Sequence, residues 1–320
     1  MLVDAGYDVV CLDRFFFGRD PIKQLDGRVR TLVDDIRWFD SALLQGIDGV
    51  LDLASLSNDP SGELDTRKTL EINYEGKVRV ASLAKKHSVK KYVLASTCSV
   101  YGASENVSDE TSALNPLTTY ARASMLAEQD ILRMADSTFS PTVLRQATVY
   151  GLSKRMRFDL AVNAMVRSFY KDGKVRIMRD GTQWRPFVHV KDTSRAFLKA
   201  LEADADLVAG GVYNVGSDDQ NYQIFELART VAEAIGLPFE YEWYGSPDSR
   251  NYRVSFEKIR RDLSFRPEFT PREGAREIYE ALKNGELDSD DPRCITVEWY
   301  KKVLSSPELA KLVELNGVVL

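Results

Sequence analysis

Over the first 150 residues, short runs of β-branched and other apolar residues alternate with longer amphipathic segments. Five apolar runs of strand length predict β-strands at residues 7–13, 29–35, 49–55, 90–97 and 140–147. Two segments with apolar residues at three- and four-residue spacing predict helices at 69–87 and 119–135. Apolar strands that alternate with helices are typical of a doubly wound parallel α/β sheet.

After about residue 150 this alternation becomes less regular. Residues 158–173 have a helical pattern that ends at Asp172-Gly173, and a strand pattern at 211–217 precedes a helix that Gly236 would end. We therefore expect three parts. They are an N-terminal sheet domain over residues 1–150, a smaller, interleaved substrate-binding lobe over 151–280, and a helical tail over 281–320.

The composition narrows the class of protein. With 320 residues, 44% hydrophobic and 28% charged, the chain has the make-up of an ordinary globular protein. Its apolar runs fall short of the roughly 20 residues of a membrane span, and no cleavable leader is visible, so we expect a cytoplasmic protein. Three widely spaced cysteines suit a reducing compartment and have no metal-binding spacing. Two histidines are too few for a histidine-rich metal site. A net charge of -5 argues against nucleic acid as a partner.

Several motifs in order give the chain a family resemblance. The chain resembles the extended short-chain dehydrogenase/reductases, in particular their nucleotide-sugar epimerases and dehydratases. The motifs that carry this resemblance are CLDRF (11–15), VDDIRWFD (33–40), LASLSND (53–59), LASTCSVYG (94–102), LRQATVYG (144–151), DGTQWRPFVHVKD (180–192), YNVGS (213–217) and DSRNYRVSFEKIRRDLSFRP (248–267). The resemblance covers nearly the whole chain, and it implies a Rossmann-like fold.

The chain departs from this family at its beginning. The family opens with a strand that runs into a GxxGxxG loop, whose backbone N–H groups bind the dinucleotide pyrophosphate. Residues 1–6 match only the end of the helix that would follow this loop. The missing strand would be central, so we expect its two neighbours to lack a partner. We expect Met1 to be an internal position of a longer natural chain. The alternative is a naturally shortened relative that does not bind the cofactor.

The resemblance places the catalytic groups at Thr97, Tyr120 and Ser124. The family's tyrosine begins a helix and has a lysine four residues later, on the same helix face. That lysine binds the nicotinamide ribose and lowers the pKa of the tyrosine. Here its position is Ser124, which carries no charge, so Tyr120 would need another cation or the oxidised cofactor to act as a base. Thr97 matches the serine or threonine that binds the substrate oxygen.

Further positions match the family's cofactor and substrate contacts. Asp13 resembles the acidic residue that binds the adenine ribose, which favours NAD over NADP. The other matches to cofactor-binding positions are Asp35, Ile36, Leu53, Ala54, Asn73 and Tyr120 itself. Arg185 and Arg250 resemble arginines that bind the diphosphate of a nucleotide sugar, and Asn163 resembles an asparagine near the same group. We interpret His189 as a packed histidine and Cys98 as a small buried residue.

The residues after Thr97 bear on the reaction. The family's 4,6-dehydratases carry an Asp-Glu pair there for acid–base chemistry, whereas this chain has Cys98 and Ser99. The resemblance therefore implies an NAD-dependent nucleotide-sugar 4-epimerase that works through a transient 4-keto sugar. A dehydratase, another NAD-dependent oxidoreductase of the same fold, and a catalytically impaired sugar-nucleotide-binding relative stay open. Helices near 62–87 and 119–136 match those that pair across a two-fold axis, so the resemblance also implies a homodimer.

Overall fold

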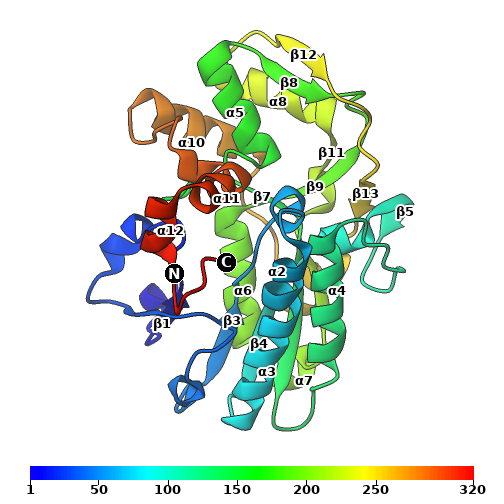
Figure 1. The fold of residues 1–320 in the computed structure, drawn as a ribbon. Helices are drawn as coiled ribbons and strands as arrows, with labels where there is room; N and C mark the ends of the chain where they lie inside the picture. Colours follow the sequence, from blue (N-terminus) through cyan, green and yellow to red (C-terminus); the bar gives the residue numbers. More distant parts are fainter.

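A computed structural model describes residues 1–320 (Figure 1). Its main sheet has four parallel strands in the order β10–β6–β4–β3. Their bounds are Gly49–Asp52 (β3), Lys91–Thr97 (β4), Ser140–Gln146 (β6) and Val212–Val215 (β10). Two further parallel strands, β1 (Val10–Asp13) and β2 (Arg30–Val33), pair only with each other. The predicted strands therefore all exist, and the predicted parallel α/β architecture is confirmed.

β1 and β3 each have a neighbouring strand on one side only. β3 pairs with β4 alone and β1 with β2 alone, so no ladder joins the two sheets. The family resemblance places a further strand between β1 and β3. The β1–β2 sheet is only partly covered, since Val10 is 39% and Val33 is 46% exposed.

Helices cover both faces of the main sheet, which Figure 1 shows at the lower right. Alternate residues of β4 point to opposite faces. Tyr92 and Leu94 pack with α3 (Lys77–Lys86) and α4 (Thr119–Leu132). Val93 packs in another core with α6 (Val190–Glu202). This double coverage explains why the strands read as continuous apolar runs.

The helix predicted at 69–87 exists, and it contains a π-helical segment. It consists of α2 (Thr66–Leu70), a π-helical turn at Glu71–Gly76, and α3. The turn places Asn73 so that its side chain bonds both backbone groups of Leu56, at 2.8 Å to the N–H and 3.0 Å to the oxygen. The π-helical turn thus lets Asn73 hold the segment that follows β3 in place; π-helical turns are frequent near functional sites.

A second lobe lies above the main sheet in Figure 1, around a core of its own. Its main elements are α5 (Ala161–Asp172), β8 (Val175–Met178), α8 (Ile224–Ile235), β12 (Tyr241–Tyr244) and α10 (Pro271–Lys283). The chain returns from it to the main sheet as β10, so the two parts are interleaved. The exact boundaries at residues 150 and 280 stay predictions.

Smaller elements connect the two parts and complete the chain. The connecting strands are β5 (Ala103–Ser108), β7 (Thr148–Tyr150), β9 (Trp184–His189), β11 (Asn221–Gln223) and β13 (Asn251–Val254). The short helices are α1 (Asp59–Gly62), α7 (Ala205–Val208), α9 (Glu257–Leu263), α11 (Thr296–Ser305) and α12 (Pro307–Val313). No helix is of a length and hydropathy that would let it cross a membrane.

α11 and α12 pack against the segment that follows β1. Phe16, Leu56, Tyr300 and Val303 form a small buried cluster, and the Trp299 indole N–H donates to the Phe16 backbone oxygen at 2.9 Å. Arg14 donates to the backbone oxygen of Val318 at 2.6 Å. The C-terminal segment is therefore held at the carboxyl end of β1, which matters for the cavity described below.

Glu277 of α10 ties the second lobe to β9. Its carboxylate accepts the Leu152 backbone N–H at 2.7 Å and lies 2.6 Å from Nε2 of the fully buried His189. Although burial works in the opposite direction, these bonds lower the pKa of Glu277 from 4.5 to about 2. His189 is thus packed and hydrogen-bonded, in agreement with its interpretation from the sequence.

This lowered pKa predicts an acid-dependent loss of stability. The Glu277 carboxylate stabilises the folded state fully above its ordinary pKa of 4.5, and this contribution is lost as the pH falls towards 2. We expect Glu277→Gln to lower the free energy of unfolding at neutral pH, and the difference from the unmodified protein to shrink in acid. Urea unfolding from about pH 6 down to about pH 3 measures it. The exposed Glu280 on the same helix provides the control Glu280→Gln, and equal pH slopes for all three proteins would contradict the prediction.

Candidate active site

Two adjoining cavities lie at the carboxyl ends of the parallel strands, where ligands bind in open α/β sheets. The larger, of about 770 Å³, lies between the main sheet and the second lobe. The smaller, of about 360 Å³, lies at the ends of β1, β2 and β3. Ser57 lines both of them. A ligand in one cavity can therefore meet a ligand in the other at this point.

Thr97 and Tyr120 lie together on the wall of the larger cavity. Thr97 ends β4, and Tyr120 is in the first turn of α4, which the Thr118 hydroxyl caps by accepting the Ala121 N–H at 3.2 Å. α1 packs closely on this turn, because a Cβ on Gly62 would lie only 2.9 Å from the Tyr120 Cβ. The strand end and the helix cap thus hold both hydroxyl groups in place.

The tyrosine is strongly held in its protonated form. Burial raises the pKa of Tyr120 to about 12, and the nearby Asp59 carboxylate raises it as well. The Thr97 hydroxyl and the Arg157 guanidinium lower it, by smaller amounts. Arg157 lines the same cavity, so it is the cation near Tyr120 that sequence reasoning did not find. It does not bring the phenol into the neutral range.

Ser124 does not replace the lysine of the family. Its hydroxyl donates to the backbone oxygen of Tyr120 at 3.0 Å, which is a common local bond for a serine in a helix. The side chain lines neither cavity. Arg122, two residues along the helix, is exposed. The structure therefore brings Thr97 and Tyr120 together and leaves Ser124 out of the cavity.

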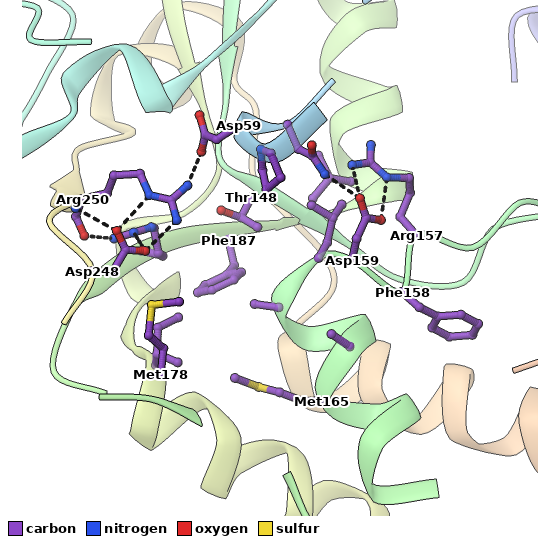
Figure 2. A pocket seen from close by; sticks show the side chains of 18 of the residues that line it. Asp59, Thr148, Arg157, Phe158, Asp159, Met165, Met178, Phe187, Asp248 and Arg250 are labelled. Atoms are coloured by element: carbon purple, nitrogen blue, oxygen red, sulfur yellow. Dashed lines mark hydrogen bonds and ion pairs between the residues drawn. The ribbon is translucent and has the colours of Figure 1, made fainter. Parts of the chain in front are cut away.

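A group of paired charges lies on one side of the larger cavity (Figure 2). Arg250 bonds the Asp248 carboxylate with Nε at 2.9 Å and Nη2 at 2.7 Å, and its Nη1 bonds Asp59. Arg185 donates to the same Asp248 carboxylate at 3.0 Å. The two arginines that the resemblance assigns to a diphosphate therefore lie side by side. Guanidinium groups bind carboxylate and phosphate oxygens in the same way, so a diphosphate would compete with these carboxylates.

A second charged pair lies across the cavity in Figure 2. Arg157 holds Asp159 through two bonds of 2.9 Å and donates to the Ser57 hydroxyl at 2.9 Å. Asp59 and Arg157 were not found from the sequence. The sequence did contain a hint of them, because both are polar residues that follow a strand, and such residues collect at one edge of the sheet in this fold. Which of them face the cavity depended on the loops.

Asn163 takes a different position from the one expected. Its amide oxygen accepts the Gly151 N–H at 3.0 Å, and its amide nitrogen donates to the Arg157 backbone oxygen at 3.1 Å. The side chain is buried and lines neither cavity. In this structure Asn163 orders the loop that carries Arg157.

The predicted cofactor residues gather around the smaller cavity, and Asp13, Asp35, Ile36, Leu53 and Ala54 all line it. Asn73 reaches it only indirectly, by fixing Leu56. A carboxylate at the end of β1 beside apolar side chains fits the ribose and adenine of a dinucleotide.

The comparisons with known proteins agree with this geometry. The model of the NAD dependent epimerase/dehydratase family matches residues 1–216. A putative UDP-glucose 4-epimerase of Methanocaldococcus jannaschii is 25% identical over 293 residues, which are 88% of this chain and 93% of that protein. The solved structure of MoeE5 in complex with UDP-glucuronic acid and NAD is 26% identical, with a TM-score of 0.78 over 89% of this chain and 93% of that one.

A further structure supports the fold. The UDP-glucuronic acid 4-epimerase of Bacillus cereus, solved with UDP-glucuronic acid and NAD, has a TM-score of 0.79 at 24% identity, over 88% of this chain and 93% of that one. Since the family model covers well over half of the sequence, and the strand ends carry the expected residues, this chain belongs to the NAD-dependent epimerase/dehydratase family.

Proposed function

We propose that this chain is an NAD-dependent nucleotide-sugar epimerase that acts at carbon 4 of the sugar. The observation that carries the proposal is the arrangement of one cavity. Thr97 and Tyr120 lie on its wall, Arg185 and Arg250 lie in the same cavity, and a dinucleotide-type cavity adjoins it at Ser57. The relatives named above, a UDP-glucose epimerase and proteins bound to UDP-glucuronic acid and NAD, support the same class of substrate.

The chemistry follows from these positions. Arg185 and Arg250 would exchange their carboxylate partners for the substrate diphosphate and so fix one end of the substrate. The Thr97 hydroxyl would bond the oxygen on carbon 4, and Tyr120 would take the proton of that hydroxyl and later return it. Bound NAD would supply the reversible two-electron oxidant, with Asp13, Asp35, Ile36, Leu53 and Ala54 as its contacts.

A direct assay tests this proposal. The purified protein would be incubated with NAD and with UDP-glucose or UDP-glucuronic acid, and the products separated by chromatography and assigned by NMR. We expect the 4-epimer, with no net change in absorbance at 340 nm. A product that has lost water would instead identify a dehydratase, and net NADH formation would identify an oxidoreductase. If neither sugar reacts and NAD does not bind, the 4-epimerase assignment fails.

The two residues that follow Thr97 favour an epimerase over a dehydratase. Of the two residues after Thr97, Cys98 is buried with its thiol directed to the Arg145 backbone oxygen, and burial raises its pKa well above the usual range. Ser99 lines the cavity but is no acid at neutral pH. The pair that a dehydratase uses at this place therefore has no counterpart here.

A catalytically impaired binding protein is the second candidate, and Ser124 favours it. A phenol with a pKa of about 12 is ionised to about one part in 10⁵ at pH 7. If the protein is active, we expect kcat to rise about tenfold per pH unit with no plateau below about pH 10, because the tyrosinate fraction rises in this way.

Ser124→Lys is the matching gain-of-function variant. We expect the added ammonium to lower the pKa of Tyr120, so that activity at pH 7 rises and the pH–rate profile reaches a plateau at a lower pH. Ser124→Met, of similar length and without charge, is the control. Equal profiles for the two variants would show that charge at this position does not limit the reaction.

We also propose a homodimer formed by α3 and α4. These helices lie next to each other, and the hydroxyl of Tyr74, in the turn before α3, donates to Asp130 of α4 at 2.6 Å. Light scattering would show about twice the chain mass of 36.1 kDa. A cytoplasmic location likewise stays a prediction from the sequence.

A further inference from the structure

Arg155 is a charged side chain that the mechanism above does not use. It lines the smaller cavity, and its guanidinium lies 3.8 Å from the centre of the Phe17 ring. Burial lowers its pKa, yet an arginine stays charged in proteins. A largely buried cation of this kind normally has a carboxylate partner.

Arg155 makes no ion pair within 4 Å. Its guanidinium makes one hydrogen bond, from Nη1 to the backbone oxygen of Arg293 at 3.0 Å. The nearby Asp159 carboxylate is already held by two bonds from Arg157. Arg155 therefore lines the cavity with a positive charge that no carboxylate within 4 Å neutralises, and it has N–H donors that are not used within the protein.

The other cation of the smaller cavity is engaged. Arg14 bonds Asp35 with Nη1 at 3.1 Å and the Val318 backbone oxygen with Nη2 at 2.6 Å. Asp35 is also held by Arg37, and the Asp13 carboxylate accepts the Phe15 N–H at 2.6 Å. Of the charges around this cavity, Arg155 is the one that an anionic ligand can use without displacing a partner.

The loop between β7 and α5 gives Arg155 its place. Arg155 and Arg157 are two residues apart, so their Cα atoms are within about 7 Å of each other. One lines the smaller cavity and the other lines the larger, while Met156 between them is buried. Arg155 also lies near Asp13 and Tyr300: burial raises the pKa of Asp13, and the Arg155 charge offsets part of that rise.

We propose that Arg155 binds the diphosphate of the dinucleotide cofactor. With adenosine at Asp13 and the reactive ring towards Tyr120, the diphosphate of such a ligand would lie within the part of the smaller cavity that leads from Asp13 to Ser57, and Arg155 lines this same cavity. The flat guanidinium, already stacked on Phe17, suits bidentate bonds to phosphate oxygens and loses little freedom in making them. This inference rests on the proposed function in that it takes NAD as the ligand.

The test compares two arginines of one loop. Calorimetry would measure the binding of NAD, ADP, adenosine and UDP to the unmodified protein, Arg155→Gln, Arg155→Lys and Arg157→Gln. We expect Arg155→Gln to weaken NAD and ADP at least about tenfold, as for a lost charge-assisted contact, and to leave adenosine and UDP unchanged. Arg155→Lys should keep part of the affinity. Arg157→Gln should leave the binding of ADP and adenosine unchanged, because Arg157 lines the larger cavity and not the smaller one.

Each result has a distinct meaning. If the unmodified protein binds NAD and Arg155→Gln binds it equally well, the role of Arg155 is overturned while the proposed function stands. Loss of UDP binding in Arg155→Gln, with NAD unchanged, would also overturn it, because Arg155 would then serve the sugar nucleotide. If the unmodified protein binds no NAD, both proposals fail together. Should the Arg155 variants not fold, competition of inorganic pyrophosphate with NAD decides in the unmodified protein, and no competition would overturn the inference.

Discussion

Tyr120→Phe is expected to lower kcat of the proposed epimerisation by about 10²- to 10⁴-fold, the usual contribution of a positioned acid–base group. The phenyl ring fills the same space beside Gly62 and Thr97, so only the proton-transferring hydroxyl is lost. Binding of NAD and of the nucleotide sugar should be little changed. Steady-state kinetics with UDP-glucose and calorimetry on the same preparation measure the two effects separately.

Tyr252→Phe is the matched control. Tyr252 is also buried, lines the same cavity and places its hydroxyl 3.5 Å from the Ser99 hydroxyl, but it is not at the start of α4. Its loss should have a small effect on kcat. If Tyr120→Phe keeps most of the activity, another group moves the proton, and Asp59 would be the first carboxylate to examine.

Glu128→Leu is expected to destabilise the protein by about 3–5 kcal/mol, because it leaves a buried guanidinium without its partner. Glu128 and Arg145 are 1% and 5% exposed. Arg145 bonds the carboxylate with Nε at 3.1 Å and Nη2 at 2.6 Å, and its Nη1 donates to the Tyr101 hydroxyl at 3.0 Å. The Ser96 hydroxyl bonds the same carboxylate. This network joins α4, which carries Tyr120, to β4 and β6.

The double variant Glu128→Leu/Arg145→Met separates the two causes. It removes both charges and keeps apolar volume, so it should recover much of the lost stability, as buried ion pairs replaced by apolar residues often do. Lys301→Ala, which removes an exposed ion pair with Glu298, is the surface control and should change little. Urea unfolding measures all of them. A single variant as stable as the unmodified protein would show that the network is not a stabilising unit.

The candidate site shows how far residue types and order can predict a place in the fold. The family resemblance assigned Thr97, Tyr120, Asp13 and Asp35 to the site, and the structure brings them to two adjoining cavities. They lie close together because parallel strands present their carboxyl ends at one edge of the sheet. Arg185 and Arg250 were matched by motif only, and their common partner Asp248 joins β9, which carries Arg185, to the loop before β13.

Other assignments could not be made from local pattern. Arg155 and Arg157 of the β7–α5 loop are two residues apart, yet they line different cavities. A loop has no fixed side-chain period of the kind that helices and strands have, so the direction of each residue is decided by packing.

The sequence by itself determined the parallel α/β class, the strands, the start of α4 and the absence of a charged group at position 124, because periodicity and residue identity are local properties. It also predicted that two strands would lack a neighbour. Only the tertiary structure decided that Arg157 is the cation near Tyr120, that Arg185 and Arg250 are paired with carboxylates, and that Arg155 has no ion-pair partner. Charge pairing and burial depend on segments far apart in the chain, and these meet only when the chain folds.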